Sequence, residues 1–403
     1  MRVCEGAGAT VRRCDVRRCD GAAVRPVALA FLLLLGSPPA AERGAIAGLT
    51  AAPELARVYA AIFDARFADV PQLLTQACGP APREACQVLD AVGLWWQIQL
   101  DPFNKTRDAA FLSRVEAAIA AAEAWAAREP ERAEAWFYLG GAYGARVQWR
   151  VLRGARLAAA RDGKRIRDAL ERAVALDTSL SDASFGIGLY HYYAAVAPAA
   201  IRMLRWLLLL PGGDRAEGLE QMLRARGGGL IVRSEADYQL HVLYLWYEHQ
   251  PERALELLAG LIERHPRNPH FRQAAADVHD VYLHDLPASL RVWQGLLDAA
   301  RAGRVAEPEM AETAARLGIA LQLDRLSQPE AAIEHLRAVI AARPRAPSGA
   351  VARAHLQLGD ALDHLGRRGE AVAAYRNAIA TAAEDDPPGI ADRARAALRA
   401  TRR

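Results

Sequence analysis

The chain has 403 residues, of which 52% are apolar and 24% are charged, and its formal net charge is +4. This apolar content is enough to bury a large core and excludes an intrinsically disordered chain. The small net charge gives no support to nucleic-acid binding, which usually needs a strongly basic surface.

The first segment, residues 1–23, differs in composition from the rest, because it carries five arginines together with Cys4, Cys14 and Cys19. A metal site is not indicated, since no second cysteine pair and no histidine lies nearby. We interpret this segment as a non-native or disordered leader, with Val24 as an alternative start, and expect it to contribute nothing to the fold.

An uninterrupted apolar run from Val27 to Leu35 follows Arg25 and precedes small residues up to Ala41. A basic flank, a short apolar core and small residues after it are typical of a cleaved secretory signal. The run is too short to span a membrane, which takes about 20 residues. We therefore predict a signal peptide at 24–41 and an exported protein, located in the periplasm if the source is bacterial.

Two further cysteines, Cys78 and Cys86, lie eight positions apart on either side of a Gly-Pro-Ala-Pro turn. An oxidising compartment would allow them to pair, so we predict a disulfide. The alternative is two small buried thiols, which behave as ordinary apolar side chains.

Apolar residues recur at helical spacing along the rest of the chain, without sustained alternation of period two, which predicts an all-α fold. Residues 136–143 place Trp136, Leu139, Gly140 and Tyr143 at the spacing W-x2-L-G-x2-Y. This spacing resembles the first helix of the tetratricopeptide repeat family. The resemblance implies stacked helical hairpins in which small residues sit at helix crossings and large residues fill the holes between them.

The same pattern returns toward the C-terminus. The steps Leu317-Gly318 and Leu358-Gly359 match the first helix of two further units, and Tyr375 matches the large residue of a second helix. Ala254 and Ala288 occupy matching positions 34 residues apart, which is the period of the family.

The middle of the chain departs from this period. The Leu139-Gly140 step is followed by the Ile187-Gly188 step after 48 residues instead of 34, which indicates an insertion at 144–164. A second insertion is expected at 196–213. We predict a tetratricopeptide-like superhelix of about six to seven hairpins, two of them with insertions. Its parts are expected to be N-terminal hairpins at 48–130, degenerate repeats at 131–268, regular repeats at 269–385 and a capping helix at 386–403.

Residues 185–271 are also faintly similar to a eukaryotic tetratricopeptide-like family involved in clearing inclusion bodies. The similarity depends on the step Gly213-Asp214-Arg215 between an apolar helix and a Gly-Leu helix. It implies no catalytic residue.

Motifs of enzymes are absent from the sequence: it holds no G-x-S-x-G, no H-E-x-x-H and no P-loop. The doublets His279-Asp280 and His284-Asp285 suggest metal ligands, but on one helix they would point about 140° apart. His191, among tyrosines, is interpreted as a packed core residue. We predict no metal, no cofactor and no enzymatic activity.

Aromatic side chains give the best indication of a binding surface, since rigid amphipathic rings are common at interaction hot spots. In the register of the family, six residues approach the concave face and would contact a protein or peptide partner: Phe185, Tyr192, Tyr193, Gln239, Trp246 and Tyr247. For each ring the alternative is simple packing between helices.

The two insertions suggest a second function, contact with a membrane surface. Arg146, Arg150 and Arg153 follow at i, i+4 and i+7 and begin a basic stripe that extends to Arg167. The apolar segment 199–210, which contains Trp206, would either fill the superhelix or lie in a membrane interface. The main hypothesis is a non-enzymatic scaffold, and the alternative is a peripheral membrane protein that contacts anionic lipid.

Overall fold

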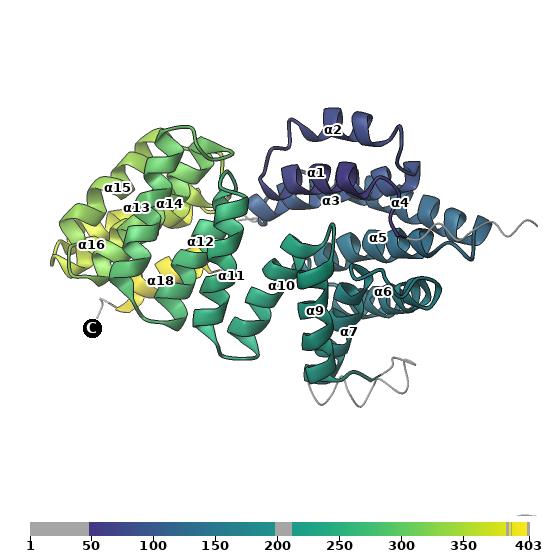
Figure 1. The fold of residues 1–403 in the computed structure, drawn as a ribbon. Coiled ribbons are helices and arrows are strands. Elements are labelled where there is room, and N and C mark those ends of the chain that lie inside the picture. The colour runs from purple at the N-terminus through teal and green to yellow at the C-terminus, as the bar shows by residue number, and fades with distance from the viewer. Residues whose placement is uncertain (1–47, 198–211, 384–386, 388, 401–403) are drawn as a thin grey trace, which may run out of the picture. The chain divides into compact units, whose positions relative to one another are not determined.

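The computed structural model describes residues 48–197, 212–383, 387 and 389–400, and every regular element within them is helical (Figure 1). The leader, the signal-peptide run and Trp206 lie outside the described residues. The prediction of an all-α, tetratricopeptide-like superhelix is confirmed.

The helices follow one another in three groups. The first group is α1 (Ala52–Phe63), α2 (Val70–Ala77), α3 (Arg83–Leu100), α4 (Asp108–Arg128), α5 (Ala133–Leu152), α6 (Arg156–Leu176) and α7 (Ala183–Val196). The second group is α9 (Arg215–Gly228), α10 (Arg233–Trp246), α11 (Pro251–Arg264), α12 (Pro269–Asp277) and the short π-helix η1 (Val278–Tyr282). The third group is α13 (Leu286–Arg301), α14 (Pro308–Arg325), α15 (Pro329–Ala342), α16 (Ala350–His364), α17 (Arg368–Thr381) and α18 (Ile390–Ala400).

Consecutive helices pack against each other as hairpins in chain order, from α3 with α4 to α16 with α17 (Figure 1). Local sequence signals set where many of these helices begin. Asn268 accepts a hydrogen bond from the His270 amide at 3.0 Å, and Asp285 accepts one from the Ala288 amide at 2.9 Å. Proline occupies the first turn of α11, α14 and α15, where a missing amide hydrogen costs nothing.

Glycines mark the places where two helices of a hairpin approach closely. A Cβ atom on Gly140 would lie 2.6 Å from the Leu170 side chain, and one on Gly359 would lie 2.4 Å from the Tyr375 ring. Both glycines belong to the Leu-Gly steps of first helices, and their large partners lie on second helices. The expected meeting of small with large residues is therefore found at these crossings.

The first insertion does not form a separate segment. Residues 144–164 lengthen both helices of one hairpin, so that α5 has 20 residues and α6 has 21, with only three residues between them. Of the second insertion, residues 198–211 lie outside the described part of the chain.

The histidine doublets do not share one helix, as the sequence had suggested. His279 and Asp280 belong to η1, whereas His284 lies in the following turn with a positive φ of 54°. Asp285 then caps α13, as described above. The π-helix ends at Tyr282, so a turn lies between the doublets His279-Asp280 and His284-Asp285.

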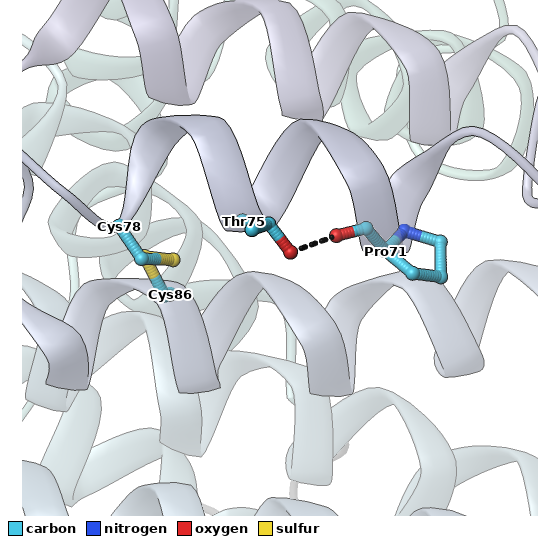
Figure 2. The surroundings of a disulfide bond; sticks show 4 residues. All are labelled: Pro71, Thr75, Cys78 and Cys86. Carbon is cyan, nitrogen blue, oxygen red and sulfur yellow. Dashed lines mark hydrogen bonds between the residues drawn. A yellow bond between two sulfur atoms is a disulfide. The ribbon is translucent and has the colours of Figure 1, made fainter.

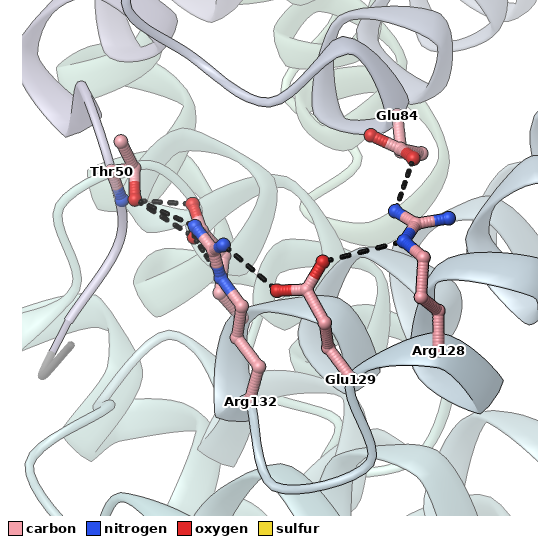
Figure 3. A network of polar contacts seen from close by, with 6 residues as sticks. Thr50, Glu84, Arg128, Glu129 and Arg132 are labelled. Atoms are coloured by element: carbon pink, nitrogen blue, oxygen red, sulfur yellow. Dashed lines mark hydrogen bonds and ion pairs between the residues drawn. The ribbon is translucent and has the colours of Figure 1, made fainter. Parts of the chain in front are cut away.

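Helix α1 ties together hairpins that are far apart in the sequence. The Tyr59 hydroxyl donates to Glu235 of α10 at 3.2 Å, and the Asn268 side chain donates to the Phe63 carbonyl at 2.8 Å. Ahead of α1, the Thr50 amide donates to Glu134 at 2.8 Å, within a polar network that includes Arg132 (Figure 3). The first helix thus braces the units that begin at α5, α10 and α12.

A disulfide joins Cys78, which ends α2, to Cys86 of α3, with 6.1 Å between the Cα atoms (Figure 2). Closing a loop of this length removes unfolded-state entropy that corresponds to about 2.5 kcal/mol of stability. The bond fixes the end of α2 to the beginning of α3. Within the residues that the structure describes, no helix is both long and apolar enough to cross a membrane.

We predict that Gly188→Ala destabilises the protein by about 2 kcal/mol or more, because its Cβ would lie 2.5 Å from the Gly218 backbone carbonyl oxygen. The two helices α7 and α9 would have to separate. Gly144→Ala is the matched control: its Cβ meets nothing within 4 Å, so it should stabilise α5 by about 0.5–1 kcal/mol. Urea unfolding midpoints measure both effects, and equal midpoints for the two variants would contradict the assigned packing.

Candidate binding surface

Three tyrosines meet where α7 and α10 end. The ring centroids of Tyr192 and Tyr193 lie 6.2 Å apart, and each of these rings lies 5.8 Å from the ring of Tyr247. All three pairs have edge-to-face geometry, which aromatic rings prefer over parallel stacking. We call Tyr192, Tyr193 and Tyr247 the tyrosine cluster.

An ion pair between Arg215 and Glu248 supports the tyrosine cluster on its buried side. The Tyr192 ring is fully buried and its hydroxyl donates to Glu248. Glu248 accepts two hydrogen bonds from Arg215, at 2.8 and 2.6 Å, and this guanidinium lowers the pKa of the carboxyl. Burial, together with the Glu248 hydrogen bond, raises the pKa of Tyr192. Tyr192 is therefore a fixed support and not a contact surface.

The other aromatic residues, Tyr193, Trp246 and Tyr247, are at least partly accessible. Tyr193 is 36% exposed and Trp246 is 62% exposed, while Tyr247 is half-buried. Desolvation, with a smaller contribution from Tyr247, raises the pKa of Tyr193, so its hydroxyl stays a neutral donor. We call Tyr193, Trp246 and Tyr247 the aromatic surface. Of the six side chains that the sequence singled out, the structure thus brings together the rings of Tyr192, Tyr193 and Tyr247.

Gln239 lies elsewhere and is half-buried between helices. Its amide donates to Gln148 at 3.2 Å and to Glu235 at 3.0 Å, and Glu235 is only 4% exposed. Burial raises the pKa of Glu235, which also accepts the Tyr59 hydroxyl. The face of α10 that was expected to be open is covered here by the chain's own α1, α3 and α5.

Contacts between aromatic rings also show that α3 covers this part of α10 and α12. The ring of Trp96 on α3 lies 5.0 Å from that of Tyr238 on α10, and 5.9 Å from that of Phe271 on α12. Phe185, the remaining predicted contact residue, is half-buried against the core. Neither Gln239 nor Phe185 therefore belongs to the aromatic surface.

The arginines of the predicted basic stripe point into the protein. Arg146 is 5% exposed and donates to both carboxylate oxygens of Asp162, at 2.9 and 2.8 Å. Arg150 donates to the same carboxylate at 2.6 Å, and Arg153 pairs with Asp108. The stripe lies on the side of α5 that faces α4 and α6, so these three side chains are satisfied inside the fold and do not form an exposed basic surface.

His191 of α7 is half-buried and faces Glu217 of α9. Its Nδ1 atom is buried without a hydrogen-bond partner, 3.6 Å from the Glu217 carboxylate. Across the described ranges, no group of three or more metal-binding side chains comes together. The support from Arg215 and Glu248 was missed in the sequence, because 33 residues separate them and neither belongs to a repeat motif.

No protein-family model matches this chain, and no curated protein matches it. Solved structures do match. The APC/C hetero-tetramer Cut9–Hcn1 matches with 14% identity and a TM-score of 0.48, over 86% of this chain and 55% of that one. Yeast Tom70 matches with 13% identity and a TM-score of 0.41, over 79% and 65%. The human IFIT1 dimer with m7Gppp-AAAA matches with 12% identity and a TM-score of 0.45, over 89% and 83%.

This chain thus spans little more than half of the first of these proteins and about two thirds of the second. At such identities the likeness concerns the arrangement of helices. It assigns neither a partner nor an activity to this chain.

We predict that Asp162→Ala destabilises the protein by about 3–5 kcal/mol, because it leaves the buried Arg146 guanidinium without its main partner. Asp168→Ala on the same helix is the control. Asp168 is 41% exposed and forms surface pairs with Lys164 and Arg167, so its loss should cost less than about 1 kcal/mol. Chemical denaturation measures both, and similar losses for the two variants would show that Asp162 has no special role.

Proposed function

We propose that this protein is a non-catalytic helical repeat scaffold that binds a protein or peptide partner through the aromatic surface of Tyr193, Trp246 and Tyr247. The observation that supports this most directly is the contact of the accessible Tyr193 and Tyr247 rings with the buried Tyr192, which is hydrogen-bonded to Glu248. Such an arrangement presents apolar area that is already ordered before a partner arrives.

The order of these rings before binding affects the free energy of association. Association costs the freedom of each side chain that becomes fixed at the interface. Tyrosine and tryptophan have only two side-chain torsions, and here the tyrosine rings hold one another at near right angles. A partner that covers them therefore gains apolar burial with little loss of side-chain entropy.

The alternative of an anionic-lipid contact receives less support. Its arginines are already paired with Asp162 and Asp108, and breaking those pairs would leave buried charges behind. The apolar segment 199–210 and Trp206 lie outside the described residues. We therefore place the binding function on the aromatic surface.

We expect the double variant Tyr193→Ala, Tyr247→Ala to lose the partner, with capture from cell extract reduced about tenfold or more, as for a hot-spot pair. The hydrogen bond from Tyr192 to Glu248 and the Arg215–Glu248 ion pair remain, so the variant should keep its helical content by circular dichroism. Tyr282→Ala is the matched control, because this tyrosine is also 36% exposed but lies on η1. Quantitative mass spectrometry compares the captured proteins; an unchanged set for the double variant would refute the assignment.

We also propose that the protein is exported. The apolar run from Val27 to Leu35 supports this, and so does the Cys78–Cys86 disulfide, since such bonds persist in oxidising compartments. Expressed in a bacterium, the full chain should appear in the periplasmic fraction with both cysteines protected from alkylation. A form lacking 24–41 should stay in the cytoplasm with both thiols modified. Equal distribution of the two forms, measured by peptide mapping, would reject export.

A further inference from the structure

Two turns that are 247 residues apart in the sequence meet at Asp101 and Ser348. Asp101 follows the last residue of α3, and Ser348 lies in the turn between α15 and α16. The Ser348 amide donates to both carboxylate oxygens of Asp101, at 3.0 and 3.1 Å, and the Ser348 hydroxyl donates to Oδ2 at 3.2 Å. We call this contact between Asp101 and Ser348 the clasp.

The clasp joins hairpins that are not neighbours in the stack. Helix α3 belongs to the first core cluster, which extends to Val278, whereas α15 and α16 contribute to the second and third clusters. In a stack of repeats each hairpin packs mainly on its neighbours, so small changes at successive crossings add up along the array. A direct contact between distant hairpins opposes this freedom, because it fixes the separation of the two turns.

Asp101 is unfavourable for the helix that it ends. A negative charge at the C-terminus of a helix opposes the helix dipole, and a positive charge is preferred there. At the N-terminus of a helix the same carboxylate is favourable, and Ser348 lies two residues before the first residue of α16. The position of this acid is therefore explained by the distant helix α16 and not by its own helix α3.

The closed clasp replaces water around a charged group. Asp101 is only 6% exposed, and in the described structure its carboxylate accepts from the amide and the hydroxyl of Ser348, which are both uncharged. A carboxylate loses hydration when it is buried, and it regains this hydration when the two turns separate. The hydrogen bonds of the closed state are thus exchanged for hydration of the same carboxylate in the open state.

We propose that the clasp holds the array closed and that its release lets the repeats α13–α18 turn away from the end of α3. The bend would occur where α12 passes into η1, because the first core cluster ends there and Asp280 ties η1 to α14 through Gln322 and Arg325. The inference goes beyond the proposed function, since neither residue of the clasp belongs to the aromatic surface.

The test measures the separation of the two turns by double electron–electron resonance on the full chain. Spin labels are attached to cysteines that replace two exposed alanines, Ala110 of α4 and Ala341 of α15. Serine replaces the three cysteines of the leader, and the Cys78–Cys86 disulfide is kept because a bonded cysteine does not react with the label. With the clasp intact we expect one narrow distance distribution.

In Asp101→Ala the distribution should move to longer distances and broaden, because all hydrogen bonds of the clasp are lost. Ser348→Ala keeps the amide donor and should give an intermediate result. Asp214→Ala is the matched control: this acid also accepts from a backbone amide at a helix end, that of Glu217 at 2.9 Å, but within its own helix α9. Its distribution should equal that of the unsubstituted chain.

An unchanged distribution in Asp101→Ala, or an equal change in Asp214→Ala, would overturn the proposal. Circular dichroism shows whether each variant keeps its helical content, so that opening is distinguished from unfolding. If Asp101→Ala loses helical content, Ser348→Ala decides, and an unchanged distribution in that variant would also overturn the proposal.

Discussion

The close approach of paired helices at glycine is the constraint on which the rest of the structure depends. At Gly359 and Gly140 the second helix inserts a large side chain where any Cβ would collide. At Gly188 and Gly218 the backbones themselves meet. At these crossings only glycine fits. The array grows by adding neighbours, and its core falls into three successive clusters along the chain, without a single centre.

A stack of helical hairpins has faces that no further hairpin covers. In this protein the N-terminal helices cover part of them. Helix α1 reaches Glu235 and the Asn268 turn, and the disulfide fixes the adjoining α2 to α3. The same contacts fill the inner face near Gln239. The accessible rings are therefore found at the ends of α7 and α10, where α1 does not reach.

The sequence predicted the helical class, the hairpins and the small-to-large contacts, because these depend on local spacing and on a few side chains per unit. Gly359 and Tyr375 illustrate this, since they lie 16 residues apart and belong to one motif. The covering of Gln239 could not be predicted in the same way. It depends on Tyr59, 176 residues from its partner Glu235, and no repeat pattern encodes that pairing.

The arginine stripe shows the same limit of local spacing. Residues at i and i+4 share one face of a helix, and Arg146 and Arg150 of α5 donate to the same carboxylate. Arg153 follows the end of α5 and pairs with Asp108. Periodicity does not say whether that face meets water or another helix. The answer depended on Asp162, a fully buried acid of the next helix that no pattern distinguished from the exposed Asp168.

Buried carboxylates in this protein hold neighbouring helices together. Around Asp162 the acid and its arginines satisfy each other, and the ensemble holds α5 to α6. Around Asp280 the Gln322 amide and Arg325 donate to one carboxylate, and they join η1 to α14. Removing one partner of such a group leaves a buried charge without compensation, which is costly, so each group resists any rearrangement that separates its two helices.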